Sequence, residues 1–119
     1  MGLDFQAEVK EGYAAPRWRY SSFNAFRKRL ATEIGLDLYG LKGFCEHGQD
    51  WPGTDDIEPL LNHSDCDGEL APLVCAVVAP RLQELMSKWE KDSYDYVHGS
   101  RLMNLMVLCA NEAVPLEFR

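Results

Sequence analysis

The segment His63–Val74, with the sequence HSDCDGELAPLV, contains the residues of this chain that most readily suggest chemistry. Asp65 and Asp67 alternate with other residues and precede a glycine, as in the middle of a helix–loop–helix calcium loop, where alternate carboxylates converge on one cation. The ends of the pattern differ, because His63 takes the first ligand position and Val74 the last, where calcium loops carry a bidentate glutamate. A calcium or magnesium ion held by Asp65 and Asp67 is one hypothesis for this segment.

Cysteine and histidine, which are softer metal ligands than carboxylates, occur in the same segment and shortly before it. Cys45 and His47 are separated by one residue, His63 and Cys66 by two, and the two pairs stand fifteen residues apart. Two thiolates and two imidazoles suit tetrahedral zinc, although a one-residue gap is unusual in structural zinc sites. The pairs predict an alternative metal site formed by Cys45, His47, His63 and Cys66.

Cys66 near His63 also offers the thiol and the base that a nucleophilic enzyme needs. Residues so close in sequence seldom adopt triad geometry, and no glycine run that could form an oxyanion hole precedes the cysteine. The sequence therefore favours a non-catalytic protein and leaves an enzymatic role open.

A structural interpretation of the segment competes with these chemical ones. Asp65 would accept backbone N–H groups across a turn, and Gly68 would adopt a positive φ. Asp67 would cap a helix that begins at Pro72, and His63 would close the preceding helix at its negative end. Under this interpretation the segment is scaffold, and function lies on an exposed face.

Charge is distributed unevenly along the chain, whose formal net charge is −7. Residues 1–43 contain seven Lys and Arg against five Asp and Glu, whereas residues 44–119 contain five against fourteen. No Lys or Arg occurs between Lys42 and Arg81, although eight acidic residues do. This distribution disfavours nucleic-acid binding by the whole domain and favours a basic partner.

The acidic segment provides the leading hypothesis for function. Asp55, Asp56 and Glu58 are predicted to lie on an acidic face that binds a protein partner. Asp55 and Glu58 also match a capping box that opens a short helix through Leu60 and Leu61. We therefore expect a small, acidic, cytoplasmic interaction protein without catalytic activity.

Arginines near the start of the chain suggest a second alternative. Arg17, Arg19, Arg27 and Arg29 could bind an anionic small ligand such as a nucleotide. The favoured explanation of Arg27, Lys28 and Arg29 is the solvated face of a helix whose other face is apolar.

Composition limits the class of protein. A length of 119 residues, with 46% hydrophobic and 26% charged residues, is typical of one globular domain spanning residues 1–119. No apolar run reaches about 18 residues, so no membrane span is predicted. The first residues lack the basic, apolar and small-residue order of a signal peptide, which favours the cytoplasm and reduced cysteines. Cys75 and Cys109 stand in apolar helical patterns and are predicted to be core residues.

Hydrophobic periodicity predicts a sheet formed by the chain ends. Residues 3–9 alternate between apolar and polar side chains, and residues 17–20 could pair with them as a hairpin. Residues 114–118 could add an edge strand beside residues 3–9.

Helices are predicted between these strands. The first would be capped by Ser21 or Ser22 and stopped by Gly35. A later helix would begin at Pro72 and kink or restart near Ala79, because the proline at position 80 removes a backbone donor.

The last helix is expected from about Tyr94 to Glu112, with Gly99 weakening its start. Together these elements predict an α+β fold: a mostly helical single domain with a central helix–loop–helix at about residues 56–90 and a small sheet from the chain ends.

Several motifs of the chain resemble those of a family of small uncharacterised bacterial and phage proteins. The motifs are a PRW run, an HSDCDGEL block, a VAPRL run and a PLEF ending, found at residues 16–18, 63–70, 78–82 and 115–118. The family has no assigned activity, so the resemblance implies the element order and a bacterial or phage setting, in which a host protein would be the partner. Its members continue after the block with Ser-Pro and acids, whereas residues 71–74 read APLV here, which removes the acid at the last calcium-ligand position.

Overall fold

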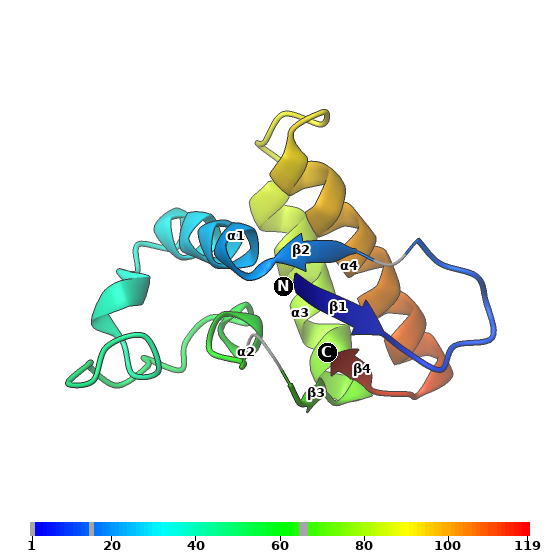
Figure 1. Cartoon of the computed structure of the whole chain (residues 1–119), viewed down its shortest axis with the longest axis horizontal. Coiled ribbons are helices and arrows are strands. Elements are labelled where there is room, and N and C mark those ends of the chain that lie inside the picture. The colour runs from blue at the N-terminus through cyan, green and yellow to red at the C-terminus, as the bar shows by residue number, and fades with distance from the viewer. Residues whose placement is uncertain (1, 15, 65–66) are drawn as a thin grey trace.

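The computed structural model describes residues 2–14, 16–64 and 67–119 and has an α+β fold (Figure 1). Two long helices, α3 and α4, pack along each other, and the strands and α1 lie across them. The helical segments are α1 (Tyr20–Glu33), the 3-10 helix η1 (Leu38–Gly40), α2 (Glu58–Leu61), α3 (Pro72–Met86) and α4 (Tyr94–Glu112). The predicted class is confirmed, and so are the start of α3 and the bounds of α4.

A four-stranded antiparallel sheet joins segments from both ends of the chain and from its middle. Its strands are β1 (Gly2–Gln6), β2 (Arg17–Arg19), β3 (Glu69–Leu70) and β4 (Leu116–Phe118), in the spatial order β2-β1-β4-β3. The predicted hairpin of β1 and β2 is confirmed, as is the pairing of the last strand with the first. The last strand is not the predicted edge strand, because β3 pairs with its other side. The sequence does not predict β3, because two residues are too few to show a period of two.

Helix α1 begins directly after β2, earlier than predicted. Ser21 and Ser22 lie inside its first turn, the N-cap position falls on Arg19, and no side chain caps this end. The predicted serine cap is therefore wrong, because β2 holds the preceding residue extended and runs straight into the helix. The predicted stop is confirmed, since Gly35 has a φ of +76° just beyond the last turn.

Helix α3 continues through Pro80, so the predicted restart near Ala79 is wrong. A proline cannot donate to the carbonyl four residues earlier, which belongs here to Ala76. Ala76 and Pro80 are both exposed, so water can reach the carbonyl that lost its partner. Val78 and Leu82, on either side of the proline, are fully buried and anchor the helix across it.

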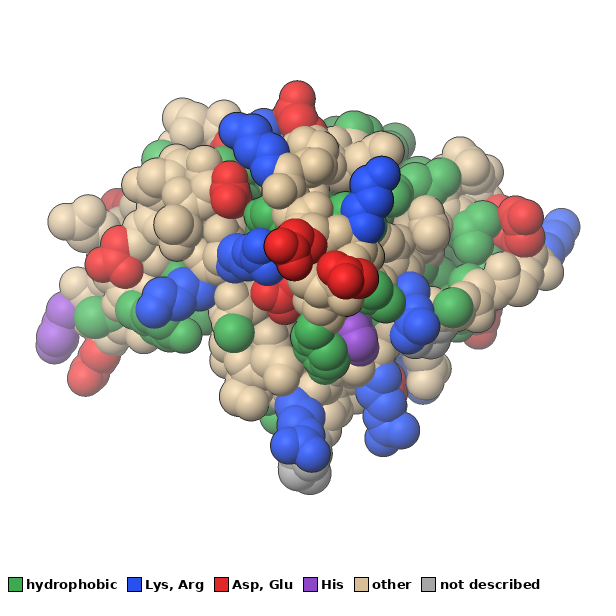
Figure 2. Space-filling model, turned by 90° about the horizontal axis from the view of Figure 1, so that it is seen from above, with side chains coloured by type: hydrophobic (Ala, Val, Ile, Leu, Met, Phe, Trp, Pro, Cys, Tyr) green, Lys and Arg blue, Asp and Glu red, His purple; other side chains and the backbone are tan. Residues whose placement is uncertain are grey.

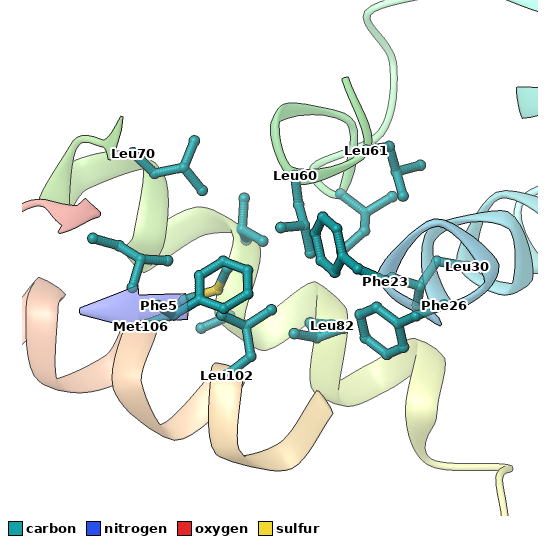
Figure 3. Close-up of a cluster of buried hydrophobic side chains, with 14 of the residues drawn as sticks. Phe5, Phe23, Phe26, Leu30, Leu60, Leu61, Leu70, Leu82, Leu102 and Met106 are labelled. Atoms are coloured by element: carbon teal, nitrogen blue, oxygen red, sulfur yellow. The ribbon is translucent and has the colours of Figure 1, made fainter. Parts of the chain in front are cut away.

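One hydrophobic core connects the sheet with the helices. Figure 3 shows Phe5, Phe23, Leu82 and Met106, from β1, α1, α3 and α4, turned toward one another. Cys75 and Cys109 are buried in the same core, as predicted. The ring of Trp18 lies between the rings of Phe5, Phe23 and Phe26, with centroids 4.9–5.8 Å away.

Gly99 permits a close approach of α4 to its neighbours. A Cβ atom at this position would collide with the sulfur of Met86 and would lie 2.9 Å from Cε1 of Phe26. A glycine at this position weakens the helix, as expected, but its lack of a side chain allows α4 to pack tightly on α1 and α3.

We predict that Gly99→Ala lowers the free energy of unfolding by about 1–3 kcal/mol, because the added methyl overpacks the contact with Met86 and Phe26. In an unobstructed helix the same change would stabilise the fold by about 1 kcal/mol. Chemical denaturation measures the effect, with Gly12→Ala as control, because a Cβ at Gly12 meets no atom within 4 Å. An unchanged or raised stability of Gly99→Ala would contradict this interpretation.

Candidate functional site

Glu58 is an internal scaffold residue. Its carboxylate accepts backbone N–H groups from Gly53, Thr54 and Asp55, at 2.9, 2.8 and 2.8 Å, and its side chain is buried. Asp55 accepts the N–H of Ile57 at 3.0 Å, so Asp55 and Glu58 form the bonds of the predicted capping box, but in the turn before α2, whose N-cap position falls on Ile57. The expectation that Glu58 lies on an exposed acidic face is wrong, because three donors in one turn hold the carboxylate inside.

Asp55 is neutralised by an arginine of α3. Its two carboxylate oxygens accept from Nε and Nη2 of Arg81, at 3.0 and 2.9 Å, and Arg81 also pairs with Glu84 at 2.6 Å. The hydrogen bonds from Arg81 lower the pKa of the Asp55 carboxyl below its ordinary value. Of the predicted partner-binding residues, only Asp56 is exposed and outside this network.

His63 connects the loop after α2 to the sheet. Its Nδ1 lies 2.8 Å from the carbonyl oxygen of Ser64 and its Nε2 lies 3.0 Å from that of Glu69, while its ring stacks on Phe118 at 3.8 Å between centroids. Both carbonyls lie beyond α2, so the expectation that His63 closes that helix is wrong. The imidazole instead spans the loop that precedes β3.

The loop around His63 agrees in part with the structural interpretation. Gly68 has a φ of +92°, as predicted. Asp67 is exposed, and the N-cap of α3 is Ala71 without a side-chain cap, so the predicted capping role of Asp67 is wrong. The loop is instead tied to the sheet, because Phe118 donates its N–H to the carbonyl of Gly68 at 2.9 Å.

The metal hypotheses are not supported by the described part of the chain. Asp65 and Cys66 lie outside the described residues, and Cys45 and His47 are exposed. Within the described ranges, no three His, Cys, Asp or Glu side chains come together to hold a metal ion. Both nitrogens of His63 face backbone carbonyls, which leaves no lone pair directed toward a cation unless the ring turns. A metal site using His63, Asp65, Cys66 and Asp67 stays a prediction.

Arg27 is buried, so the expectation that it lies on a solvated helix face is wrong. Its guanidinium donates to the carbonyls of Leu61 and His63, at 3.2 and 2.7 Å, and to the side chain of Asn24. The same group lies 4.7 and 4.8 Å from the ring centroids of Phe23 and Phe44. Arg27 thus holds α1 against the end of α2.

The other predicted ligand-binding arginines occupy two separate places. Arg29 pairs with Asp95 at 3.2 Å and lies 4.0 Å from the ring centroid of Trp89. Arg17 and Arg19 project from the same face of β2 and line a surface pocket of about 370 Å³ together with Tyr94. The structure therefore brings together two of the four arginines.

The tertiary structure assembles an acidic group that the sequence does not reveal. Glu69 of β3 stands directly opposite Glu117 of β4, and Glu8 lines the same surface depression of about 240 Å³. We call Glu8, Glu69 and Glu117 the acidic sheet edge. Arg119 forms an ion pair with Glu117 at 2.7 Å. Strand alternation in the sequence indicates a polar face, but the register that opposes these two glutamates depends on β3.

The buried cysteines are poor candidates for chemistry. Burial, with the neighbouring Cys109, raises the pKa of the Cys75 thiol to about 12. Burial also raises the pKa of the Cys109 thiol. A thiol with a raised pKa carries little of the reactive thiolate at neutral pH.

Comparisons with protein-family models, curated proteins and solved structures found no match. The resemblance carried by the HSDCDGEL block therefore stays a prediction. In the part of the chain that the structure describes, no helix has the length and apolar character needed to cross a bilayer.

We predict that Asp55→Asn lowers the free energy of unfolding at pH 7 by about 1–3 kcal/mol, because it removes the charged partner of Arg81. The folded pKa of Asp55 is lowered, so the unfolded chain takes up the proton first as pH falls. The stabilisation is therefore present above the unfolded pKa of about 3.9 and disappears as pH falls through the folded pKa. The stability curve of the variant should be flatter in that window.

Urea denaturation between pH 2 and pH 7 measures this difference. Asp56→Asn is the matched control, since the adjacent exposed carboxylate should change stability little at any pH. Parallel curves for wild type and Asp55→Asn would show that the pair with Arg81 does not stabilise the fold.

Proposed function

We propose that this protein is a non-catalytic interaction protein that binds a basic partner protein through its acidic surface. The surface consists of the acidic sheet edge and the exposed carboxylate of Asp67, two residues before Glu69. It replaces the face predicted at Asp55, Asp56 and Glu58, two of which are engaged inside the fold. A partner of opposite charge is favoured because the whole chain has a net charge of −7.

The opposition of Glu69 and Glu117 is the observation that carries this proposal. Like charges directly opposite each other on neighbouring strands destabilise a sheet by about 0.2–1 kcal/mol. Arg119 neutralises one of the pair, and Glu69 stays exposed at the edge strand. A cationic side chain of a partner placed between the two carboxylates would convert this repulsion into attraction.

Charge is mixed elsewhere on the molecule. On the face shown in Figure 2, acidic and basic side chains are interspersed and no field of one sign dominates. The ion pairs of Arg29 with Asp95 and of Lys42 with Asp50 similarly balance charge away from the sheet edge. These features support a localised acidic binding surface.

The free protein already offers a test of the electrostatic premise. We predict that Glu69→Gln raises the free energy of unfolding by about 0.2–1 kcal/mol at low ionic strength, because the cross-strand repulsion is removed. The gain should shrink in about 1 M salt, where the Debye length is about 3 Å. Glu90→Gln, an exposed glutamate in the loop between α3 and α4, is the control. A loss of stability in Glu69→Gln would contradict the repulsion.

Partner binding is tested with two doubly substituted proteins of equal net charge. Glu69→Gln with Glu117→Gln neutralises the acidic sheet edge, whereas Glu90→Gln with Asp92→Asn neutralises two exposed acids elsewhere. Quantitative affinity capture from a native bacterial lysate should recover the same basic partner with wild type and the second protein, and not with the first. Equal recovery by all three, or equal loss by both variants, would count against a specific acidic site.

A second candidate function is binding of a small anion at β2. Its support is the pocket shared by Arg17, Arg19 and Tyr94, in which an aromatic ring stands beside two guanidinium groups. Arg17 is also paired with Asp4 at 3.1 Å, which reduces its charge toward a ligand.

A thermal-shift titration with ATP and with inorganic phosphate tests the anion candidate. We predict that a stabilising nucleotide loses its effect in Arg19→Ala and keeps it in Arg101→Ala, an exposed arginine of α4. The absence of a shift with either anion, or an equal shift in both variants, would remove this candidate.

A further inference from the structure

Helix α3 has an apolar face in solvent as well as one in the core. Leu73, Ala76, Val77 and Pro80 are all exposed, and their spacing of three, four and seven residues places them along one side of the helix. Leu73 is 83% exposed and Val77 48% exposed, so the first side chain is largely hydrated and the second about half hydrated. We call these four residues the outer stripe of α3. A surface helix normally carries polar residues there, and clustered exposed apolar side chains mark interaction sites.

The buried side of α3 does not account for the outer stripe. Cys75, Val78 and Leu82 are fully buried and pack the helix into the core. Stability of the domain therefore requires those residues, while the outer stripe makes no contribution to the core. Replacing an 83% exposed leucine by a polar residue would remove hydrated apolar area without opening a cavity.

The charges beside the outer stripe are mostly negative. Glu84, which is 68% exposed, lies two helical turns beyond Val77 on the same side. Arg81 is the only basic residue of α3, and it is held by Asp55 and Glu84. Asp56 adds an exposed carboxylate next to Asp55.

At the other end of the helix, Glu69 stands just before Pro72, which opens α3. The outer stripe is thus an apolar line with acidic residues near both of its ends.

We propose that the outer stripe of α3 binds an amphipathic helix of a partner protein, with leucine-like residues on one face and Lys or Arg beside them. This inference rests on the proposed function and specifies its partner. Residues 73–80 span about 10 Å, two turns of helix, which matches the contact made by one crossing helix. The small side chain of Ala76 allows close approach, and the exposed carboxylates of Asp56 and Glu69 would pair with the partner's cations, since Asp55 and Glu84 already pair with Arg81.

A second copy of the chain fits this face less well. Self-association would bring together two molecules with a net charge of −7 each, and both copies would carry the same acidic flanks. A basic helix instead meets the apolar stripe and the acids with complementary groups.

The test uses the full chain and a synthetic peptide of about 18 residues. Leu residues in this peptide are spaced so that they share one face of a helix, and Lys residues lie beside them. A peptide of the same composition in scrambled order is the control ligand. We expect the ordered peptide to bind at least about tenfold more tightly than the scrambled one, and to shift first the backbone amide resonances of residues 73–79, which precede Pro80.

Leu73→Ser and Val77→Ser should each weaken binding by about tenfold, the effect of losing one buried aliphatic side chain at an interface. Tyr39→Ser is the control, since Tyr39 is another exposed apolar residue, 48% exposed, on η1. The thermal midpoint of Leu73→Ser should equal that of wild type, which shows that the variant is folded. No binding, equal binding of both peptides, or unchanged affinity in Leu73→Ser would overturn the inference.

The variant with Glu69→Gln and Glu117→Gln separates this inference from the proposed function. If it weakens binding and Leu73→Ser does not, the acidic surface stands and the outer stripe does not. If Leu73→Ser weakens binding and the glutamate variant does not, the stripe binds without the acidic sheet edge. Light scattering over a concentration series completes the test, because a dimer that Leu73→Ser dissociates would make a second copy the occupant and overturn the proposal.

Discussion

The pairing of the two chain ends within one sheet is the constraint on which the rest of the structure depends. β1 is bonded to β2 on one side and to β4 on the other, and β4 holds β3 at the edge. Phe118 carries this arrangement into the core, with its ring 4.7 Å from that of Phe5 and 3.8 Å from the imidazole of His63. Because β3 leads directly into α3, the same pairing sets where α3 starts and which of its sides faces solvent.

The acidic residues of this chain divide into two groups with different physical roles. Glu58 accepts hydrogen bonds from backbone N–H groups, and Asp55 forms an ion pair with Arg81. Both residues stabilise the turn that precedes α2. Glu69 and Glu117 stand opposite each other with Arg119 paired to Glu117, so the group of two carboxylates and one guanidinium keeps a net negative charge. The first group therefore stabilises the fold, and we propose that the second group binds a partner.

The two proposed features meet at the start of α3. Glu69 ends the sheet just before α3, and Leu73 begins the outer stripe within the first turn of that helix. A basic amphipathic partner would gain from apolar burial along the helix and from charge at its start, and each contribution alone would be modest. Affinity would then depend on both, which is how interfaces acquire specificity from weak individual contacts.

The amino-acid sequence by itself determined the features that depend on neighbours along the chain. These include the start of α3 at a proline, the positive φ of Gly68 and the bounds of α4, because turn chemistry and hydrophobic period act over a few residues. Only the tertiary structure decided that Glu58 and Arg27 are buried and that Glu69 meets Glu117. A charged side chain is buried or exposed according to donors, acceptors and rings supplied by distant segments, and a charge count along the sequence does not contain that information.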